Sequence, residues 1–260
     1  MTTPFSVATW NVNSLRARID HVLQWLKESG VDVVCLQETK MTDDRFPADV
    51  LREAGYEHLV WHGQPTYNGV AILSRYPLED IQTGLPDDED DPQARYVSAT
   101  VLGVEVHNVY VPNGQAVGSD KFHYKLRWLE RLHQRLQGRV SAERPLILCG
   151  DMNIAPDDVD VWDPFVMDGQ LLCHPEERRR LEAIRALGLR DGFRERNPFA
   201  SAFSWWDYRQ RGFERNHGVR IDLIYASEAL HTRCTDVSIH RHVRSWERPS
   251  DHCPVVATFE

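Results

Sequence analysis

The sequence predicts an α/β protein, of mixed α+β character, in which β-sheets occupy the middle and helices cover them. Short runs rich in β-branched residues recur along all 260 residues and are bounded by Gly, Pro, Asn or Asp. Segments with apolar residues at helical spacing lie between them. The two kinds of segment do not alternate strictly, so we expect a mixed or antiparallel sheet in place of a purely parallel one.

Eight runs are predicted as strands. Most are almost entirely apolar, which is typical of strands that are covered on both faces. Two of them are separated by a single residue and predict a hairpin-like pair. The predicted strands span 5–10, 31–37, 69–74, 95–102, 104–111, 145–150, 220–227 and 254–259.

Three segments predict helices, at about 15–30, 119–138 and 175–188, and a glycine that stops the helix ends each range. Ser119 has the side chain preferred at an N-cap, and Pro175 suits the first turn of the third helix. The helices thus fall between predicted strands, as covering helices should.

Length and composition predict one domain over residues 1–260 in the cytoplasm. The apolar fraction of 42% supports a full core, and no linker or repeat divides the chain. The first residues lack the features of a secretory signal, and no apolar run is long enough to span a membrane. The five cysteines form no CxxC pair, so we expect reduced thiols, with Cys35 and Cys149 in the core.

The net charge of −9 argues against a nucleic-acid-binding domain when taken alone. The charge is unevenly distributed, however. Residues 86–91 and 151–168 together hold 11 acids, whereas residues 201–260 are balanced, with 8 Arg and 8 acids. The global charge therefore does not decide whether the protein binds DNA.

Polar side chains follow the apolar runs at six separate places. Because residues i and i+2 of a strand point to one face, Asp151 and Asn153 converge if extended geometry continues past Gly150. Active sites of sheet proteins are commonly built where several strand ends meet. The candidate side chains are Asn11 and Asn13, Glu38, Tyr110 and Asn113, Asp151 and Asn153, Asp222, and His252.

Each candidate also has an ordinary structural interpretation. These alternatives must all hold together for the site to vanish, which is why we favour a site. The alternatives are turn roles for Asp151 and Asn11, a half-buried strand tyrosine for Tyr110, an ion pair of Asp222 with Arg220 or Arg215, and a hydrogen-bonded structural histidine for His252.

The chemistry of this set suits hydrolysis of a phosphodiester. Glu38 with Asp and Asn oxygens offers hard ligands for Mg²⁺ or Mn²⁺. The sequence has no HExxH, cysteine cluster, GxxxxGK[ST] or GxSxG, which argues against zinc, an NTPase and a serine esterase. A hard cation would polarise the phosphate while a carboxylate takes a proton from water and His, Asn and Tyr stabilise the developing charge.

Eight motifs occur in order from about residue 6 to 259: TWNVNSLRAR, CLQETK, YNGVAILSR, NVYVPNG, CGDMNIAP, FSWWDYR, RIDLIYAS and PSDHCPV. Together they resemble the exonuclease III family of apurinic/apyrimidinic DNA endonucleases, in the endonuclease/exonuclease/phosphatase superfamily. The resemblance implies a deoxyribonuclease I-like, four-layer α/β sandwich, with two mixed β-sheets packed face to face and helices outside.

The resemblance also implies a function in base-excision repair. The expected enzyme is Mg²⁺-dependent, with Mn²⁺ as an alternative, and cleaves double-stranded DNA 5′ to abasic sites to leave a 3′-hydroxyl. It would also have 3′ to 5′ exonuclease activity and clean blocked 3′ ends. We expect a monomer without a protein partner or membrane contact, in the cytoplasm and at the nucleoid when it acts.

Carried over residue by residue, the resemblance implies catalytic roles. Asp151 would deprotonate or orient the attacking water, or alternatively protonate the leaving oxygen. Asn153 would orient the Asp151 carboxyl group and contact the phosphate. His252, paired with Asp222, would donate to a phosphate oxygen. Tyr110 would donate to the phosphate or align the leaving group. The implied metal ligands are Glu38, the principal one, with Asn11, Asp151, Asn153 and Asp251, and Asn13 would support them.

The same resemblance also implies a DNA-binding surface and a pocket for a flipped-out abasic sugar. Segment 162–174 lies beside that pocket, and its Leu172 and His174 match no family pattern, so the sequence does not rank the activities. The implied DNA contacts are Asn68, Asn113, Lys121, Trp206 and Arg209. The implied pocket residues are Phe203, Trp205, Val219 and Ile221.

Three rival functions stay open at this stage. A 3′-end processor with weak endonuclease activity would keep the same chemistry. A sphingomyelinase-like or inositol-phosphatase-like phosphoesterase would share the catalytic groups, but WNVNSLRAR, QETK and SWWDYR favour the DNA branch. A catalytically inactive, RNA- or protein-binding regulator would have lost the catalytic acids, which are all present here.

Overall fold

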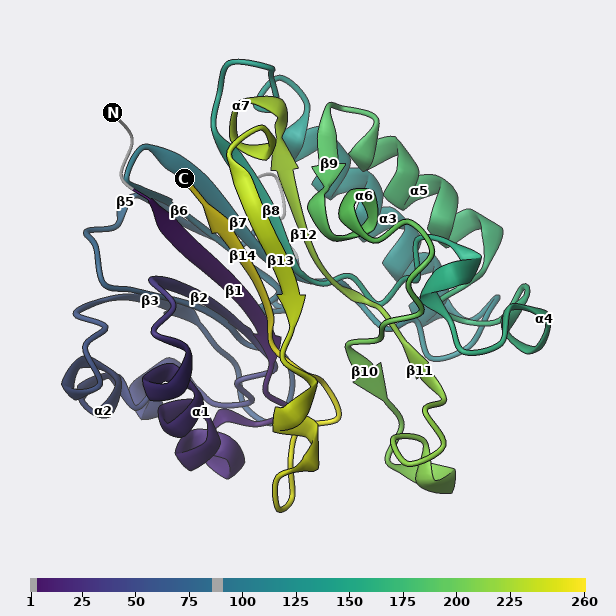
Figure 1. The fold of residues 1–260 in the computed structure, drawn as a ribbon, viewed down its shortest axis with the longest axis horizontal. Helices are drawn as coiled ribbons and strands as arrows, with labels where there is room; N and C mark the ends of the chain where they lie inside the picture. The colour runs from purple at the N-terminus through teal and green to yellow at the C-terminus, as the bar shows by residue number, and fades with distance from the viewer. Residues whose placement is uncertain (1–3, 86–90) are drawn as a thin grey trace.

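Two six-stranded sheets pack face to face, with helices on their outer sides (Figure 1). The computed structural model describes residues 4–85 and 91–260. The first sheet has the order β13 (Cys234–Ile239), β14 (Val255–Phe259), β1 (Phe5–Asn11), β2 (Val33–Gln37), β4 (Val70–Ser74) and β3 (His58–His62). The second has the order β5 (Glu79–Thr83), β6 (Tyr96–Val101), β7 (Val104–Tyr110), β8 (Leu146–Asp151), β12 (Asp222–Ser227) and β9 (Leu189–Asp191).

Both sheets are mixed. The pairs β1–β2 and β7–β8 are parallel, and the other neighbouring strands are antiparallel. Together with the outer helices this makes the four-layer α/β sandwich that the resemblance implied. The predicted fold class is therefore confirmed.

Strand β1 shows how the sequence builds the layers. Val7 belongs to the core between the sheets, whereas Ala8 and Trp10 belong to the core under the helices of the first sheet. Successive side chains of a strand point to opposite faces, so one strand contributes to both cores. Asn11 continues the inner-face series of Val7 at the end of the strand, which aims a polar group between the sheets.

The three predicted helices form, and α2 (Ala48–Glu53), which was not predicted, joins them in covering the sheets. α1 (Leu15–Ser29) and α2 pack on the first sheet, and α3 (Asp120–Leu136) and α5 (Pro175–Arg185) pack on the second. Gly30 closes α1 in the left-handed conformation, at φ 62°, and Ser119 caps α3 by accepting from the Phe122 N–H. The shorter helices are α4 (Pro164–Met167), α6 (Gly192–Arg196) and α7 (Glu228–His231), and the 3₁₀ turns are η1 (Asp43–Arg45), η2 (Asp158–Asp160), η3 (Arg209–Arg211) and η4 (Arg241–Ser245).

Strands β3, β5, β9 and β13 were not predicted from the sequence, and each is the edge strand of its sheet. A small separate hairpin of β10 (Trp205–Trp206) and β11 (Gly218–Val219) was also not predicted. All five cysteines are free and buried, which includes the two expected in the core. Among the described residues, no helix has the length and apolar character needed to cross a membrane.

Candidate active site

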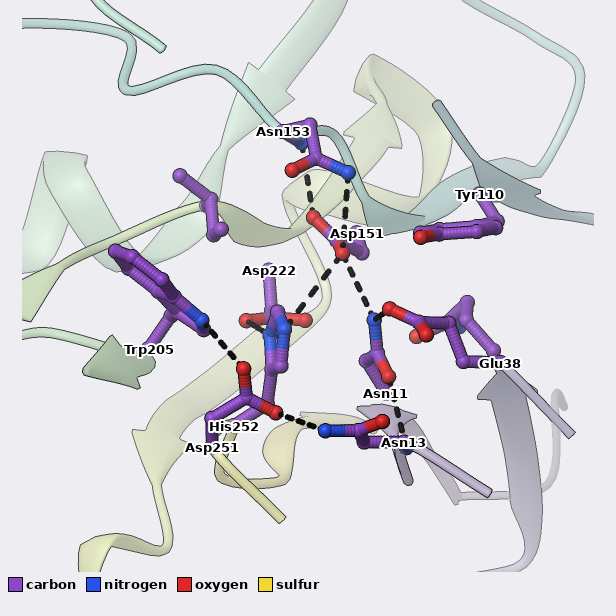
Figure 2. Close-up of polar contacts among 12 residues, drawn as sticks. Asn11, Asn13, Glu38, Tyr110, Asp151, Asn153, Trp205, Asp222, Asp251 and His252 are labelled. Atoms are coloured by element: carbon purple, nitrogen blue, oxygen red, sulfur yellow. Dashed lines mark hydrogen bonds and ion pairs between the residues drawn. The ribbon is translucent and has the colours of Figure 1, made fainter. Parts of the chain in front are cut away.

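The polar strand ends meet where the two sheets come together at one end of the sandwich. The pairing register places Tyr110 of β7 and Asp222 of β12 on either side of Asp151 of β8. From the other sheet, Asn11 ends β1, and Glu38 directly follows β2. Figure 2 shows these side chains converging on one volume from both sheets.

Asn11 joins the two sheets at the site. Its Nδ2 donates to Oε1 of Glu38 at 2.9 Å and to Oδ2 of Asp151 at 2.9 Å (Figure 2). Glu38 also forms an ion pair with Lys40, at 2.7 Å. Burial opposes ionisation of Glu38, but Lys40 and Asn11 outweigh it and hold the pKa of this carboxyl below its usual value. The Glu38 carboxylate is therefore ionised and can act as a ligand for a cation.

His252 is held between two carboxylates. Its Nδ1 lies 2.8 Å from Oδ2 of Asp222, and its Nε2 lies 3.8 Å from Oδ2 of Asp151. Burial alone would lower the pKa of His252, but Asp222 and Asp151 raise it to about 10. An imidazolium at this point is a hydrogen-bond donor toward the site. The alternative pairing of Asp222 with Arg220 is wrong, because Arg220 pairs with Asp160 and Asp191.

Burial, followed by the neighbouring Asp222, raises the pKa of Asp151 to about 7, although His252, Asn11 and Asn153 favour its charged form. Asn153 binds both of its oxygens: the backbone N–H donates to Oδ1 at 2.9 Å, and Nδ2 lies 3.3 Å from Oδ2. A carboxyl with this pKa exchanges protons near neutral pH, as a general base or acid must.

Asp151 and Asn153 converge, but not by the extended geometry that the sequence suggested. Asn153 has φ 49°, in the left-handed region, so the chain turns at the end of β8. Asn13, Glu38 and Asn68 also have positive φ, at 44°, 53° and 56°. Asn tolerates this region, but Glu38 does so at a cost, and such strain is typical of functional sites.

Three carboxylates lie around His252: those of Glu38, Asp151 and Asp222. Ligand atoms of Glu38, Asp151 and His252 lie within 4.8 Å of one another. Oδ1 of Asp222 is buried and has no hydrogen-bond partner among the residues that the structure describes. Excess buried negative charge and hard oxygen donors fit a divalent cation such as Mg²⁺. Because His252 is held as an imidazolium, we assign the metal-binding role to the oxygen donors and expect Glu38 to lead.

Asp251 and Asn13 lie at the edge of this set. Asp251 accepts from Nδ2 of Asn13 at 2.9 Å and from Nε1 of Trp205 at 2.9 Å, so both of its oxygens are engaged (Figure 2). Lys40 donates to Oδ1 of Asn13 at 2.6 Å. These contacts support Asn13 in a positioning role, and the metal-binding role of Asp251 stays a prediction.

Tyr110 faces a cleft of about 530 Å³ beside the carboxylates. Burial and the neighbouring Glu38 raise the pKa of Tyr110 well above its ordinary value, so the phenol stays a donor. The same cleft is lined by the predicted DNA contacts Asn68, Asn113 and Lys121. The structure therefore brings these three together with Tyr110.

A second cavity, of about 360 Å³, lies between segment 162–174 and the β10–β11 hairpin. Trp205 and Val219 line it, as the pocket prediction requires, whereas Ile221 does not line it and packs in the apolar cluster behind them. Arg209 is at its rim, paired with Asp207 at 2.7 Å.

Two predictions for the aromatic stretch are corrected. Trp206 has no exposed surface and packs against Phe203 in a separate core cluster. It therefore cannot contact DNA in this conformation, and Phe203 supports the wall from behind instead of lining the pocket. Successive strand residues point to opposite faces, so Trp205 and Trp206 of β10 could not share one surface.

Several residues at the site were not predicted from the sequence. Lys40 belongs to the QETK motif but was not assigned a role. Arg95 lines the cleft and lies over the Tyr110 ring, 4.6 Å from its centroid. Lys125 binds two backbone carbonyls of the site from beneath. Only its position gave a signal: Lys125 follows Phe122 by three residues on the apolar face of its helix.

With this geometry established, comparison with known proteins decides the family. The model of the Endonuclease/Exonuclease/phosphatase family matches residues 8–252. The chain belongs to this family. Exodeoxyribonuclease III of Haemophilus influenzae is 37% identical over 264 residues, covering 97% of this chain and 98% of the relative.

Two solved structures are similar over 98% of this chain and 99% of theirs. One is a 3′ phosphatase, NExo, from Neisseria, bound to product DNA hairpin, with a TM-score of 0.96 and 42% identity. The other is an AP endonuclease from Archaeoglobus fulgidus, with a TM-score of 0.94 and 40% identity. The resemblance to the exonuclease III group is thus confirmed, and the protein is a hydrolytic, metal-dependent, DNA-cleaving nuclease.

Proposed function

We propose that this enzyme is a Mg²⁺-dependent DNA-repair phosphodiesterase. It cleaves 5′ to abasic sites in double-stranded DNA, leaving a 3′-hydroxyl, and it also trims and cleans 3′ ends. The observation that carries the proposal is the Asp222–His252–Asp151 arrangement, linked through Asn11 to Glu38 of the opposite sheet. We further propose a cytoplasmic monomer that needs no protein partner.

Each catalytic side chain has a task that its geometry supports. When bound, Mg²⁺ would polarise the scissile phosphate, held by Glu38 with the help of Asn11. Asp151, with a pKa of about 7, takes a proton from the attacking water, or alternatively protonates the leaving oxygen. His252 donates from Nε2 to a phosphate oxygen while Asp222 fixes the ring through Nδ1.

The surroundings of the site supply further donors. Tyr110 stays protonated and can donate to the phosphate or align the leaving group. Asn153 and Asn113 are joined by a hydrogen bond, from Nδ2 of Asn113 to Oδ1 of Asn153, at 3.1 Å. This link holds Asn153 beside Asn113, which lines the cleft together with Asn68 and Lys121. Phosphate contacts of this kind position a duplex without selecting its sequence.

A second candidate, a 3′-end processor with weak abasic-site cleavage, is favoured by Leu172. This side chain is 7% exposed and packs in the apolar cluster of Val219 and Ile221, where the sugar pocket is expected. It also has φ 75°, an unfavourable conformation for leucine. A leucine held in this way narrows the space for a flipped-out sugar but leaves the hydrolytic groups intact.

The test uses 5′-labelled duplexes that carry an abasic-site analogue, a 3′-phosphate or a plain recessed 3′-hydroxyl. Each is incubated with enzyme in Mg²⁺ and in EDTA. Metal-dependent incision at the analogue supports the main proposal and ranks it against 3′-end processing. Action at 3′ ends alone supports the second candidate. No action on any duplex refutes both.

Leu172→Gly separates the two candidates within one protein. We expect it to raise incision at the analogue relative to 3′-phosphate removal, because it empties part of the pocket. Leu102→Gly is a matched control, since Leu102 also has positive φ, at 51°, but lies in the turn between β6 and β7. An unchanged ratio in Leu172→Gly would mean that this side chain does not limit entry of the sugar.

A further inference from the structure

Lys125 is a fully buried lysine directly beneath the DNA-facing edge. It lies on α3, and its side chain has no exposed surface. Its Nζ donates to the backbone oxygen of Asn153 at 2.7 Å and to that of Asn113 at 3.2 Å. Its third partner is Glu177 of α5, also fully buried, with which it forms an ion pair. The three donors of the ammonium group therefore all have acceptors.

The ammonium group joins two loops that are separate in sequence. Asn113 follows β7, and Asn153 follows β8. Their side chains are hydrogen-bonded to each other, and Asn153 binds both oxygens of Asp151. Packing around this point is close, because a Cβ added to Gly114 would lie 3.3 Å from Cδ of Lys125. A displacement of Lys125 would thus be transmitted to both asparagines.

Glu177 fixes the other side of the ammonium group. One of its oxygens pairs with Lys125, and the other accepts from the His174 N–H at 3.1 Å, in the capping box of α5. A buried lysine is costly unless it is paired and hydrogen-bonded. A pair of apolar residues would dock α3 on α5 without that cost, but it could not bind the two carbonyls.

We propose that Lys125, paired with Glu177, is a positioning residue for phosphodiester hydrolysis, which sets Asn113 and Asn153 through their backbone carbonyls. This inference rests on the proposed function for its kinetic consequences. Lys125 does not touch substrate in this role, so its effect on the rate must pass through Asn113 and Asn153. The proposal predicts a loss of turnover that is larger than any loss of DNA affinity, because Asn113 is also an expected DNA contact.

The principal variant is Lys125→Met with Glu177→Gln. It removes both charges together, so that no unpaired buried charge is left, and Gln keeps an acceptor for the His174 N–H. The matched control is Arg180→Met with Glu130→Gln, which removes another ion pair between α3 and α5, of 2.7 Å, away from the carbonyls. If the principal variant does not fold, Lys125→Gln, which retains a donor, takes its place with a smaller effect expected.

Single-turnover rates on the best duplex substrate, at saturating enzyme and over a concentration series, give the rate and the apparent affinity. We expect the principal variant to lose roughly 10- to 100-fold in rate, a larger loss than any change in affinity, with a melting temperature close to that of the control. In a background of Asn113→Ala and Asn153→Ala, the same change should cost less than in the parent, because the two side-chain amides are gone while the backbone N–H of residue 153 still binds Asp151. Equal losses in the control would overturn the proposal.

The side-chain amide signals of Asn113 and Asn153 provide a readout that needs no activity. In ¹H–¹⁵N spectra, we expect them to shift in the principal variant and to stay in place in the control; unmoved signals would overturn the proposal. If the parent enzyme cleaves no duplex, the proposed function fails and the spectra still decide the positioning. If the parent cleaves DNA and the principal variant cleaves equally fast, only the positioning role fails.

Discussion

Gly150→Ala should displace the catalytic end of β8 and destabilise the fold. Gly150 directly precedes Asp151 and pairs with Val109 and Leu223 in neighbouring strands. At its φ of 146°, an added Cβ would lie 1.9 Å from the backbone oxygen of Val109 and 2.8 Å from its carbonyl carbon. Neither contact can be relieved by a side-chain rotation, so one of the two strands has to shift.

Two terms set the size of this effect. Overpacking in a core costs about 1–3 kcal/mol, and a left-handed conformation costs a non-glycine residue about 1–2 kcal/mol. Their sum is about 2–5 kcal/mol, which corresponds to a fall of about 4–20 °C in melting temperature for a chain of this size. A shift of Asp151 should also lower turnover, measured well below the melting temperature of the variant.

Gly138→Ala separates the two terms. Gly138 has φ 77°, but an added Cβ there would meet nothing within 4 Å. This control therefore carries the conformational cost alone, about 1–2 kcal/mol. Thermal unfolding of both variants, together with single-turnover rates, gives the difference. If Gly150→Ala were no less stable than Gly138→Ala and equally active, the close approach of β7 and β8 would not be what fixes Asp151.

Three other changes test the remaining chemistry. Asp151→Asn should reduce the single-turnover rate at least 100-fold while fluorescence anisotropy shows near-normal DNA binding; near-normal rates would refute the proton-transfer role. Glu38→Ala should raise the Mg²⁺ concentration needed for half-maximal rate after EDTA treatment, and an unchanged requirement would place the metal elsewhere. Oε1 of Glu105 lies 3.0 Å from Nε2 of His107 and 2.6 Å from Nη1 of Arg139, and His107, followed by Arg139, lowers the pKa of Glu105 to about 2. Because this pKa is depressed, its stabilisation is present above about pH 4.3, the unfolded value, and is lost as pH falls toward 2. The melting temperatures of the parent and Glu105→Gln should therefore differ at pH 7 and converge as the pH falls from about 4 to about 2; a constant difference would contradict the assignment.

The strands that the sequence did not predict share a physical cause. β3, β5, β9 and β13 are the four edges of the two large sheets. An edge strand has a neighbour on one side only, so it needs no continuous apolar run; most of β5, for example, is exposed. Interior strands such as β8 are buried along their whole length and are therefore visible as apolar runs.

The positions of the candidate site residues could be predicted more fully than their geometry. Polar groups at the ends of apolar runs stand out, because burying them there needs a reason. The left-handed turn that brings Asn153 back to Asp151 depends on tertiary contacts, and the tolerance of Asn for this region is too weak a signal to predict it. Lys125 and Glu177 were missed because charged residues on helices usually face solvent, and only contact between α3 and α5 makes them buried partners.

The site follows from how two sheets share one interior. Along β1, β2, β8 and β12, alternate residues face inward and are apolar in the middle of the sandwich. At one end the same alternation brings polar residues inward from both sheets, among them Asn11 and Asp151. Further inside, Gln37 of β2 donates to Asn108 of β7 at 2.8 Å, which ties the sheets together just behind the site. Catalytic groups from opposite sheets can keep fixed distances only if the sheets do not slide, and these buried amides oppose sliding because any shift would leave polar groups unpaired. The strand register that buries the core therefore also brings Asp151 and Asp222 next to His252.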